Sequence, residues 1–187
     1  MNLHKFGIKL YLNDSGNFDS KEFIPVFHNW IQDKVVSDHI LIDVVDYSHI
    51  PDGPGVMLIA HEGTFSLDQE NQQSGIMYMR KTELEGDFKE RFIHVLSNAI
   101  QAANRLRDNT INKKIDFIHN SFRFITNDRR VAGNTIANQN LYKDKVQKAL
   151  TEKYSIYELE YKDISKENER LAFTVNFNQN NNILDEH

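Results

Sequence analysis

A recurring order of predicted elements constrains the fold of this chain more than any other feature. Residues 8–14 (IKLYLND) and 122–128 (FRFITND) are both alternating apolar segments that end in Asn-Asp. A segment of helical spacing follows each, with apolar residues at corresponding positions: Phe27, Ile31 and Val35, then Tyr142, Val146 and Leu150. Two predicted strands come next in each half: residues 40–46 and 56–61, then 155–161 and 171–176. We therefore expect two pseudo-symmetric β-α-β-β units, at about residues 5–61 and 119–176.

The two units are expected to share one hydrophobic core. Each alone would bury too little apolar surface to be stable. The whole chain of 187 residues, of which 40% are hydrophobic, has the ordinary size of one domain. We place this domain at residues 1–177 and predict that the Asn- and Gln-rich residues 178–187 form a flexible tail.

An extra predicted strand and the longest predicted helix lie between the two units. The strand is residues 75–81, and the helix covers about residues 88–107, preceded by Asp87 and Glu90 at the spacing of a capping box. This helix is expected to bridge the two halves of the core. Strands outnumber helices, and short turns join neighbouring strands. The predicted class is therefore α+β, with one largely antiparallel sheet of about six or seven strands and about three principal helices.

Charge and composition exclude several classes of function. The chain has 22 Lys and Arg against 27 Asp and Glu, and this net charge of −5 disfavours non-specific binding to nucleic acid. It has no cysteine, which excludes disulfides, thiolate metal sites and a cysteine nucleophile. No apolar run is long enough to cross a membrane, and the N-terminal residues lack the apolar core of a signal peptide. We expect a soluble, cytoplasmic protein that binds neither nucleic acid nor membrane.

Three stretches of the sequence resemble a family of uncharacterised bacterial proteins. They are residues 24–32 (IPVFHNWIQ), 46–55 (DYSHIPDGPG) and 124–129 (FITNDR). The likeness extends over about residues 24–81 and 122–135. The resemblance implies a stand-alone domain. Because no activity is established for that family, the resemblance assigns no catalytic residue.

The turn after the predicted strand 40–46 holds a first candidate site, formed by Asp46, Tyr47, His49 and Asp52. A histidine between carboxylates can act as a general base or bind a metal. In the alternative interpretation, both aspartates accept hydrogen bonds from backbone N–H groups of the turn, and His49 lies on the surface. This second interpretation is favoured, because Asp before Gly is common in turns.

His39, His61 and Glu62 form a second candidate site. In the predicted hairpin, His61 ends one strand opposite the start of the other strand, near His39. Two imidazoles and a carboxylate can hold zinc, and His61 with Glu62 can also serve acid–base catalysis. The spacing matches no diagnostic metal motif, so a strand-end histidine that is hydrogen-bonded to a neighbouring carbonyl is the favoured interpretation.

Arg129, Arg130, Asn134 and Thr135 form a third candidate site. A predicted helix starts at Asn134 or Thr135. Free N–H groups at a helix start, together with guanidinium groups, suit a small anionic ligand. The competing interpretation is an ordinary loop whose arginines pair with the acidic surface.

Two acidic residues occupy corresponding positions in the two units. Asp43 lies in segment 40–45, which is otherwise apolar on both faces and is therefore interpreted as a central, covered strand. A buried carboxylate needs a partner. Since Glu158 is its counterpart, we expect both to have a structural role, with an arginine such as Arg123 as partner.

The sequence lacks a Ser-His-Asp order, a phosphate loop and a dinucleotide fingerprint. We therefore expect a non-catalytic ligand-binding or assembly domain whose ligand and cofactor are unknown. The alternative is a small enzyme, with or without a metal, that uses His49 or the pair His61 and Glu62. Because so few helices leave part of a broad sheet uncovered, we also expect a homodimer.

Overall fold

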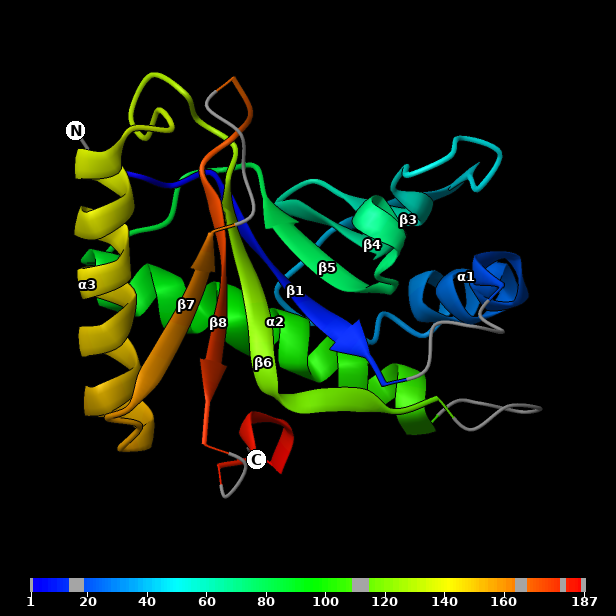
Figure 1. Ribbon diagram of the computed structural model, residues 1–187. Helices are drawn as coiled ribbons and strands as arrows, with labels where there is room; N and C mark the ends of the chain where they lie inside the picture. Colours follow the sequence, from blue (N-terminus) through cyan, green and yellow to red (C-terminus); the bar gives the residue numbers. More distant parts are fainter. Residues whose placement is uncertain (1, 14–18, 109–114, 164–167, 179–180, 186–187) are drawn as a thin grey trace.

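The computed structural model describes residues 2–13, 19–108, 115–163, 168–178 and 181–185 (Figure 1). These residues form one eight-stranded sheet in the order β2-β3-β4-β5-β1-β6-β8-β7, with every neighbouring pair antiparallel. The strands are β1 (Phe6–Leu12), β2 (Leu41–Tyr47), β3 (Gly55–Ala60), β4 (Gly63–Asp68), β5 (Gly75–Arg80), β6 (Phe117–Thr126), β7 (Leu159–Asp163) and β8 (Ala172–Phe177). The helices are α1 (Ile24–Gln32), α2 (Phe88–Asp108) and α3 (Ile136–Tyr154), with short 3₁₀ turns η1 (Ser20–Phe23), η2 (Glu70–Gln72) and η3 (Ile183–Asp185). The predicted α+β class is confirmed, although the sequence predicts six or seven strands.

The three α-helices pack on one face of the sheet. Alternate residues of β1, namely Phe6, Ile8 and Leu10, point to this face and belong to a core that includes residues of all three helices. Aromatic contacts join each helix to a strand: Trp30 with Phe65, Phe92 with Phe122, and Tyr142 with Phe124. The opposite face, called the far face below, carries the other alternate residues of each strand.

Local signals in the sequence set where two helices begin. The backbone N–H of Glu90 donates to Oδ1 of Asp87 (2.9 Å), and the N–H of Asp87 donates to Oε2 of Glu90 (2.8 Å), so the predicted capping box is present at the start of α2. Pro25 lies in the first turn of α1, where its missing N–H costs no hydrogen bond. None of the helices within the described ranges is long and apolar enough to cross a bilayer.

The order β-α-β-β recurs along the chain, but the structure does not confirm the internal duplication. In the second half, β6 pairs directly with β8. In the first half, the hairpin of β4 and β5 separates β1 from β3. The sequence pattern suggests that residues 62–74 are loose and at most extend a strand. Instead the chain reverses between Ala60 and Gly63, at a short turn whose two central residues, His61 and Glu62, are not the Gly or Asn that usually mark one.

The prediction that segment 40–45 forms a central strand is wrong, because β2 is an edge of the sheet. Ile40 and Ile42 are 65% and 57% exposed. Asp43 is exposed and accepts a hydrogen bond from the N–H of Val44 (2.8 Å). An apolar run alone does not distinguish a covered strand from an edge strand with an apolar surface.

The expected role of Arg123 as partner of Asp43 or Glu158 is also wrong. Glu158 is exposed, and Arg123 pairs with Glu70, whose carboxylate Oε2 lies 2.6 Å from Nη1. Glu70 belongs to the connection between β4 and β5, which the sequence pattern does not resolve into elements.

The described end of the chain differs from the predicted flexible tail. Ile183 and Leu184 are buried against the core, and Nδ2 of Asn104 in α2 donates to the carbonyl of Leu184 (2.9 Å). One apolar pair in a polar segment is a weak signal, but it is enough to anchor η3. The other parts of that predicted tail, residues 179–180 and 186–187, lie outside the described residues.

Candidate functional site

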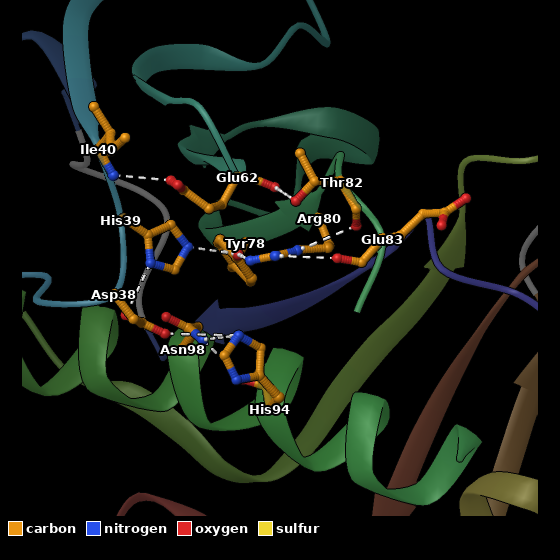
Figure 2. A network of polar contacts seen from close by, with 10 residues as sticks. All are labelled: Asp38, His39, Ile40, Glu62, Tyr78, Arg80, Thr82, Glu83, His94 and Asn98. Atoms are coloured by element: carbon orange, nitrogen blue, oxygen red, sulfur yellow. Dashed lines mark hydrogen bonds and ion pairs between the residues drawn. The ribbon is translucent and has the colours of Figure 1, made fainter. Parts of the chain in front are cut away.

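A network of polar side chains connects the segment before β2 with β5 and α2 (Figure 2). Its centre is the ring of His39, which is buried between Asp38 and Tyr78. Nδ1 of His39 lies 2.9 Å from Oδ1 of Asp38, and Nε2 lies 2.6 Å from the hydroxyl of Tyr78. The three side chains thus form a carboxylate–imidazole–phenol chain.

A neutral His39 satisfies both contacts when Nδ1 carries the proton, because Nε2 then accepts the hydroxyl hydrogen of Tyr78. Burial raises the pKa of the Tyr78 phenol to about 12, so the phenol stays protonated at neutral pH. Such a chain can hold or pass a proton. It ends at a phenol that is 0% exposed, so the Tyr78 hydroxyl cannot meet a substrate from solvent.

Arg80 and Glu62 also belong to the network (Figure 2). Arg80 is buried, and its guanidinium donates to the carbonyls of Thr82 (3.3 Å) and Glu83 (3.4 Å). Glu62 accepts a hydrogen bond from the N–H of Ile40 (2.8 Å). Partial burial works against ionisation of Glu62, but this bond acts together with a second backbone hydrogen bond and with the nearby His39 and His61, and the pKa of the carboxyl is lowered.

Asp38 and His94 are the accessible members of the network. Their side chains are 51% and 33% exposed, and Nε2 of His94 lies 3.7 Å from Oδ2 of Asp38. Asn98, one turn further along α2, donates to the carbonyl of His94 (2.9 Å). Burial lowers the pKa of His94, against the opposing effect of Asp38. Burial would raise the pKa of Asp38, but the contact with His39 prevails and lowers it.

The structure brings His39 and Glu62 into this network but leaves His61 outside it. The His61 side chain is exposed, and only its backbone N–H reaches this region, where it donates to the carbonyl of Ile40 (2.9 Å). Among the residues described, no three His, Asp or Glu side chains converge as metal ligands would. Both ring nitrogens of His39 contact side chains, those of Asp38 and Tyr78, whereas the interpretation from the sequence expects a neighbouring carbonyl as the partner.

The first candidate site has the geometry of a turn. Oδ1 of Asp46 accepts from the N–H of Ser48 (2.8 Å), and Asp52 has a positive φ of 52°. His49 is exposed, with its ring centre 6.4 Å from that of Tyr47. The contact of Asp46 is the one that the alternative interpretation expects, whereas Asp52 contributes a left-handed backbone conformation to the turn.

The third candidate site lies at the start of α3, where a side chain of the protein already accepts a hydrogen bond from one of the backbone N–H groups. Thr135 is the N-cap, and its hydroxyl accepts from the N–H of Asn138 (3.2 Å). Oδ1 of Asn134 accepts from the amide of Gln139 (2.9 Å). Arg129 and Arg130 are both exposed. Binding of an anion by these two arginines stays a prediction.

A cluster of four charged residues on the far face is not among the sites predicted from the sequence. Lys9 of β1 pairs with Asp68 at the end of β4, and Arg123 of β6 pairs with Glu70. Burial lowers the pKa of Lys9, although Asp68 opposes the shift. One signal in the sequence points to this cluster, since Lys9 and Arg123 occupy the same position in the two segments IKLYLND and FRFITND.

The edge strand β2 and the residues next to its ends expose four large apolar side chains, together called the β2 edge patch below. It consists of Ile40, Ile42, Tyr47 and Ile50, with exposed fractions of 65%, 57%, 38% and 41%. At the other edge of the sheet, β7 exposes Glu160 and Lys162. Charged side chains protect a sheet edge from pairing. β2 also exposes two of them, Asp43 and Asp46, but the exposed apolar residues Ile42 and Tyr47 lie beside them.

Comparison with protein-family models finds no match, and comparison with the curated proteins finds none either. Membership of the uncharacterised bacterial family stays a prediction, and the proposals below rest on the geometry of the molecule.

Proposed function

We propose that this protein is a non-catalytic assembly domain that forms a homodimer through β2. The observation that carries the proposal is the β2 edge patch. An edge strand offers unpaired backbone N–H and C=O groups, and exposed apolar side chains beside them favour association. A second copy of the chain supplies both a strand to pair with and apolar side chains to cover the patch.

The residues of β2 restrict how two copies can pair. Side chains opposite each other in an antiparallel pair lie on the same face, and successive residues alternate between faces. When two copies of β2 pair around a two-fold axis, one residue must therefore lie opposite the same residue of the second copy, and the axis passes between these two. An axis at Val44 places Asp43 opposite Val45 of the second copy, and an axis at Val45 places Asp43 opposite Tyr47. Both registers avoid the destabilising contact of Asp43 with itself.

Replacement of Val45 by aspartate tests this dimer, because it places two carboxylates opposite each other in either register. Sedimentation at micromolar concentration is expected to give twice the chain mass of 21.9 kDa for the wild type and the single chain mass for Val45→Asp. Lys162→Asp changes the charge of the other sheet edge and is expected to leave the dimer intact.

Thermal unfolding of both variants shows whether they remain folded. A wild type that sediments as one chain at every concentration refutes the proposal. So does a Val45→Asp variant that is folded and as dimeric as the wild type.

A small enzyme that uses histidine and carboxylate is the second candidate function. The Asp38–His39–Tyr78 chain favours it through its exposed end, because the Asp38 carboxylate is accessible and the His39 imidazole bonded to it can exchange a proton. Metal analysis of the purified protein is the simplest test of its metal-dependent form. A stoichiometric metal that is lost in the His39→Ala variant supports the enzyme, and a metal-free protein excludes this form of it.

A further inference from the structure

The far face of the sheet carries a row of side chains that is apolar at one end and cationic in the middle. Residues directly paired across neighbouring strands share a face. The register from β3 to β8 therefore places on the far face, in this order, Met57, Ser66, Met77, Lys9, Arg123 and Thr174. Met79 lies on the same face, opposite Gly7. Three of the four methionines of the chain thus lie on the far face, and Met77 is directly opposite Lys9.

The two cations are buried although they lie on the face opposite the helices. Lys9 is 0% exposed and Arg123 is 6% exposed. The connection between β4 and β5 covers them, since Glu70 extends from the end of β4 across β5 and β1 to reach Arg123 on β6. Gly75 makes room for this arrangement, because a Cβ there would lie 3.1 Å from Cε of Lys9 and 2.3 Å from the carbonyl oxygen of Leu10.

Glu70 satisfies Arg123 incompletely. Its carboxylate contacts Nη1, while Nε of Arg123 is buried and has no hydrogen-bond partner among the described residues. A buried donor without a partner is destabilising. A guanidinium binds a carboxylate best through two parallel N–H groups, and Glu70 does not provide this geometry.

The connection that carries Glu70 has a strained backbone. Asn71 and Gln72 are consecutive non-glycine residues in the left-handed region, with φ of 59° and 57°. The Glu70 side chain is 35% exposed, whereas that of Arg123 is 8% exposed. Glu70 is therefore the more exposed partner of the pair, and its release would uncover Arg123.

The hydroxyl groups beside the cations add a further donor. The hydroxyl of Tyr11 lies 3.0 Å from Oγ1 of Thr174, and Thr174 is opposite Arg123 in the sheet. One hydrogen of such a pair joins the two oxygens, which leaves the other hydrogen for an additional acceptor. Without Glu70, the remaining charges of Lys9, Arg123 and Asp68 amount to one positive charge, which suits one carboxylate.

We propose that Arg123, Lys9 and the Tyr11–Thr174 hydroxyl pair form a binding site for a small carboxylate with an apolar body, and that Glu70 occupies this site in the free protein. The carboxylate of the ligand replaces Glu70 at Arg123. Its apolar body lies toward Met77, whose flexible side chain adapts to different shapes. Glu70 is a tethered competitor and lowers the apparent affinity of the wild type.

Calorimetric titration with hexanoate tests the site. Glu70→Gln keeps the size of the side chain but removes the competing charge, and it is expected to bind hexanoate about tenfold more tightly than the wild type. Hexanamide has the same apolar body without the charge, and it is expected to bind neither protein. Inorganic phosphate has the charge without the apolar body, and it is expected to bind more weakly than hexanoate.

Two further variants locate the binding. The double variant Glu70→Gln/Arg123→Gln has a neutral pair in place of the ion pair, so it is expected to fold and to lose hexanoate binding. Adding Arg129→Ala and Arg130→Ala to Glu70→Gln removes the arginines before α3 and is expected to retain binding. Equal affinity of wild type and Glu70→Gln, binding of hexanamide, stronger binding of phosphate, or a loss that follows Arg129 and Arg130 would each overturn the proposal.

Discussion

Tyr78 connects the aromatic core to the buried polar network. Its ring centre lies 4.7 Å from that of Phe65 and 5.3 Å from that of His39, and its hydroxyl contacts Nε2 of His39 and Nη1 of Arg80. A buried polar atom that loses its partner costs more than the hydrogen bond itself is worth. The hydroxyl of Tyr78 therefore matters mainly because it satisfies His39.

The Tyr78→Phe variant tests this role. It keeps the ring and removes only the hydroxyl, which leaves Nε2 of His39 without its partner. We expect the free energy of unfolding in urea to fall by about 1–3 kcal/mol. Tyr157→Phe is the matched control, because Tyr157 is 70% exposed, and a change below about 0.5 kcal/mol is expected there. Equal stability of the two variants would contradict a structural role for the Tyr78 hydroxyl.

Among the elements, α3 shows most clearly how one side chain sets a helix boundary. Its N-cap, Thr135, has an extended backbone and accepts a hydrogen bond from Asn138. At the other end, Ser155 adopts a left-handed conformation with φ of 57°, and its N–H donates to the carbonyl of Thr151 (3.1 Å). The cap at Thr135 satisfies a donor that the predicted anion site would otherwise use.

Replacement of Thr135 tests how much the N-cap contributes to stability while Arg129 and Arg130 stay unchanged. Thr135→Ala is expected to lower the free energy of unfolding by about 0.5–2 kcal/mol, because the N–H of Asn138 loses its acceptor. Thr135→Ser keeps a hydroxyl at this position and is expected to retain most of the stability. Urea denaturation of both variants provides the measurement. If serine destabilises as much as alanine, the cap is not the source of the effect.

At the scale of the whole molecule, three groups of the polar network make stability depend on pH in the same direction. The pKa values of His94, Asp38 and Glu62 are all lowered in the folded protein. In each case the unfolded chain takes up a proton before the folded protein does, so stability rises with pH across the interval between the two pKa values. The contribution of His94 is complete above its ordinary pKa of 6.5 and is lost below it. The stability contributions of the Asp38 and Glu62 carboxyl groups are lost only in acid.

Urea denaturation over a series of pH values checks this dependence. The free energy of unfolding of the wild type is expected to fall as the pH drops below 6.5, and to fall again below the ordinary pKa values of Glu62 (4.5) and Asp38 (3.8). The His94→Gln variant is expected to lose the first decrease and to keep the second. A variant that retains both decreases would show that other groups cause the first one.

Much of the secondary structure could be predicted from local patterns in the sequence. The capping box of Asp87 and Glu90, the position of Pro25 and the turn between β2 and β3 depend on residues close together in the chain. The candidate sites were less predictable. His39 and Glu62 could be grouped through the hairpin, but Tyr78 and His94 join them only because β5 and α2 pack beside that hairpin.

The sequence by itself determined the class of fold and most of the helices and strands, because the period of apolar residues reflects which side of each element avoids water. Only the tertiary structure decided that β2 is an edge, that Ile183 and Leu184 complete the core, and that Glu70 covers Arg123. The physical reason is that an apolar pattern records the need for burial but does not specify the partner. The pair of Glu70 and Arg123 joins residues 53 positions apart, and no local pattern links them.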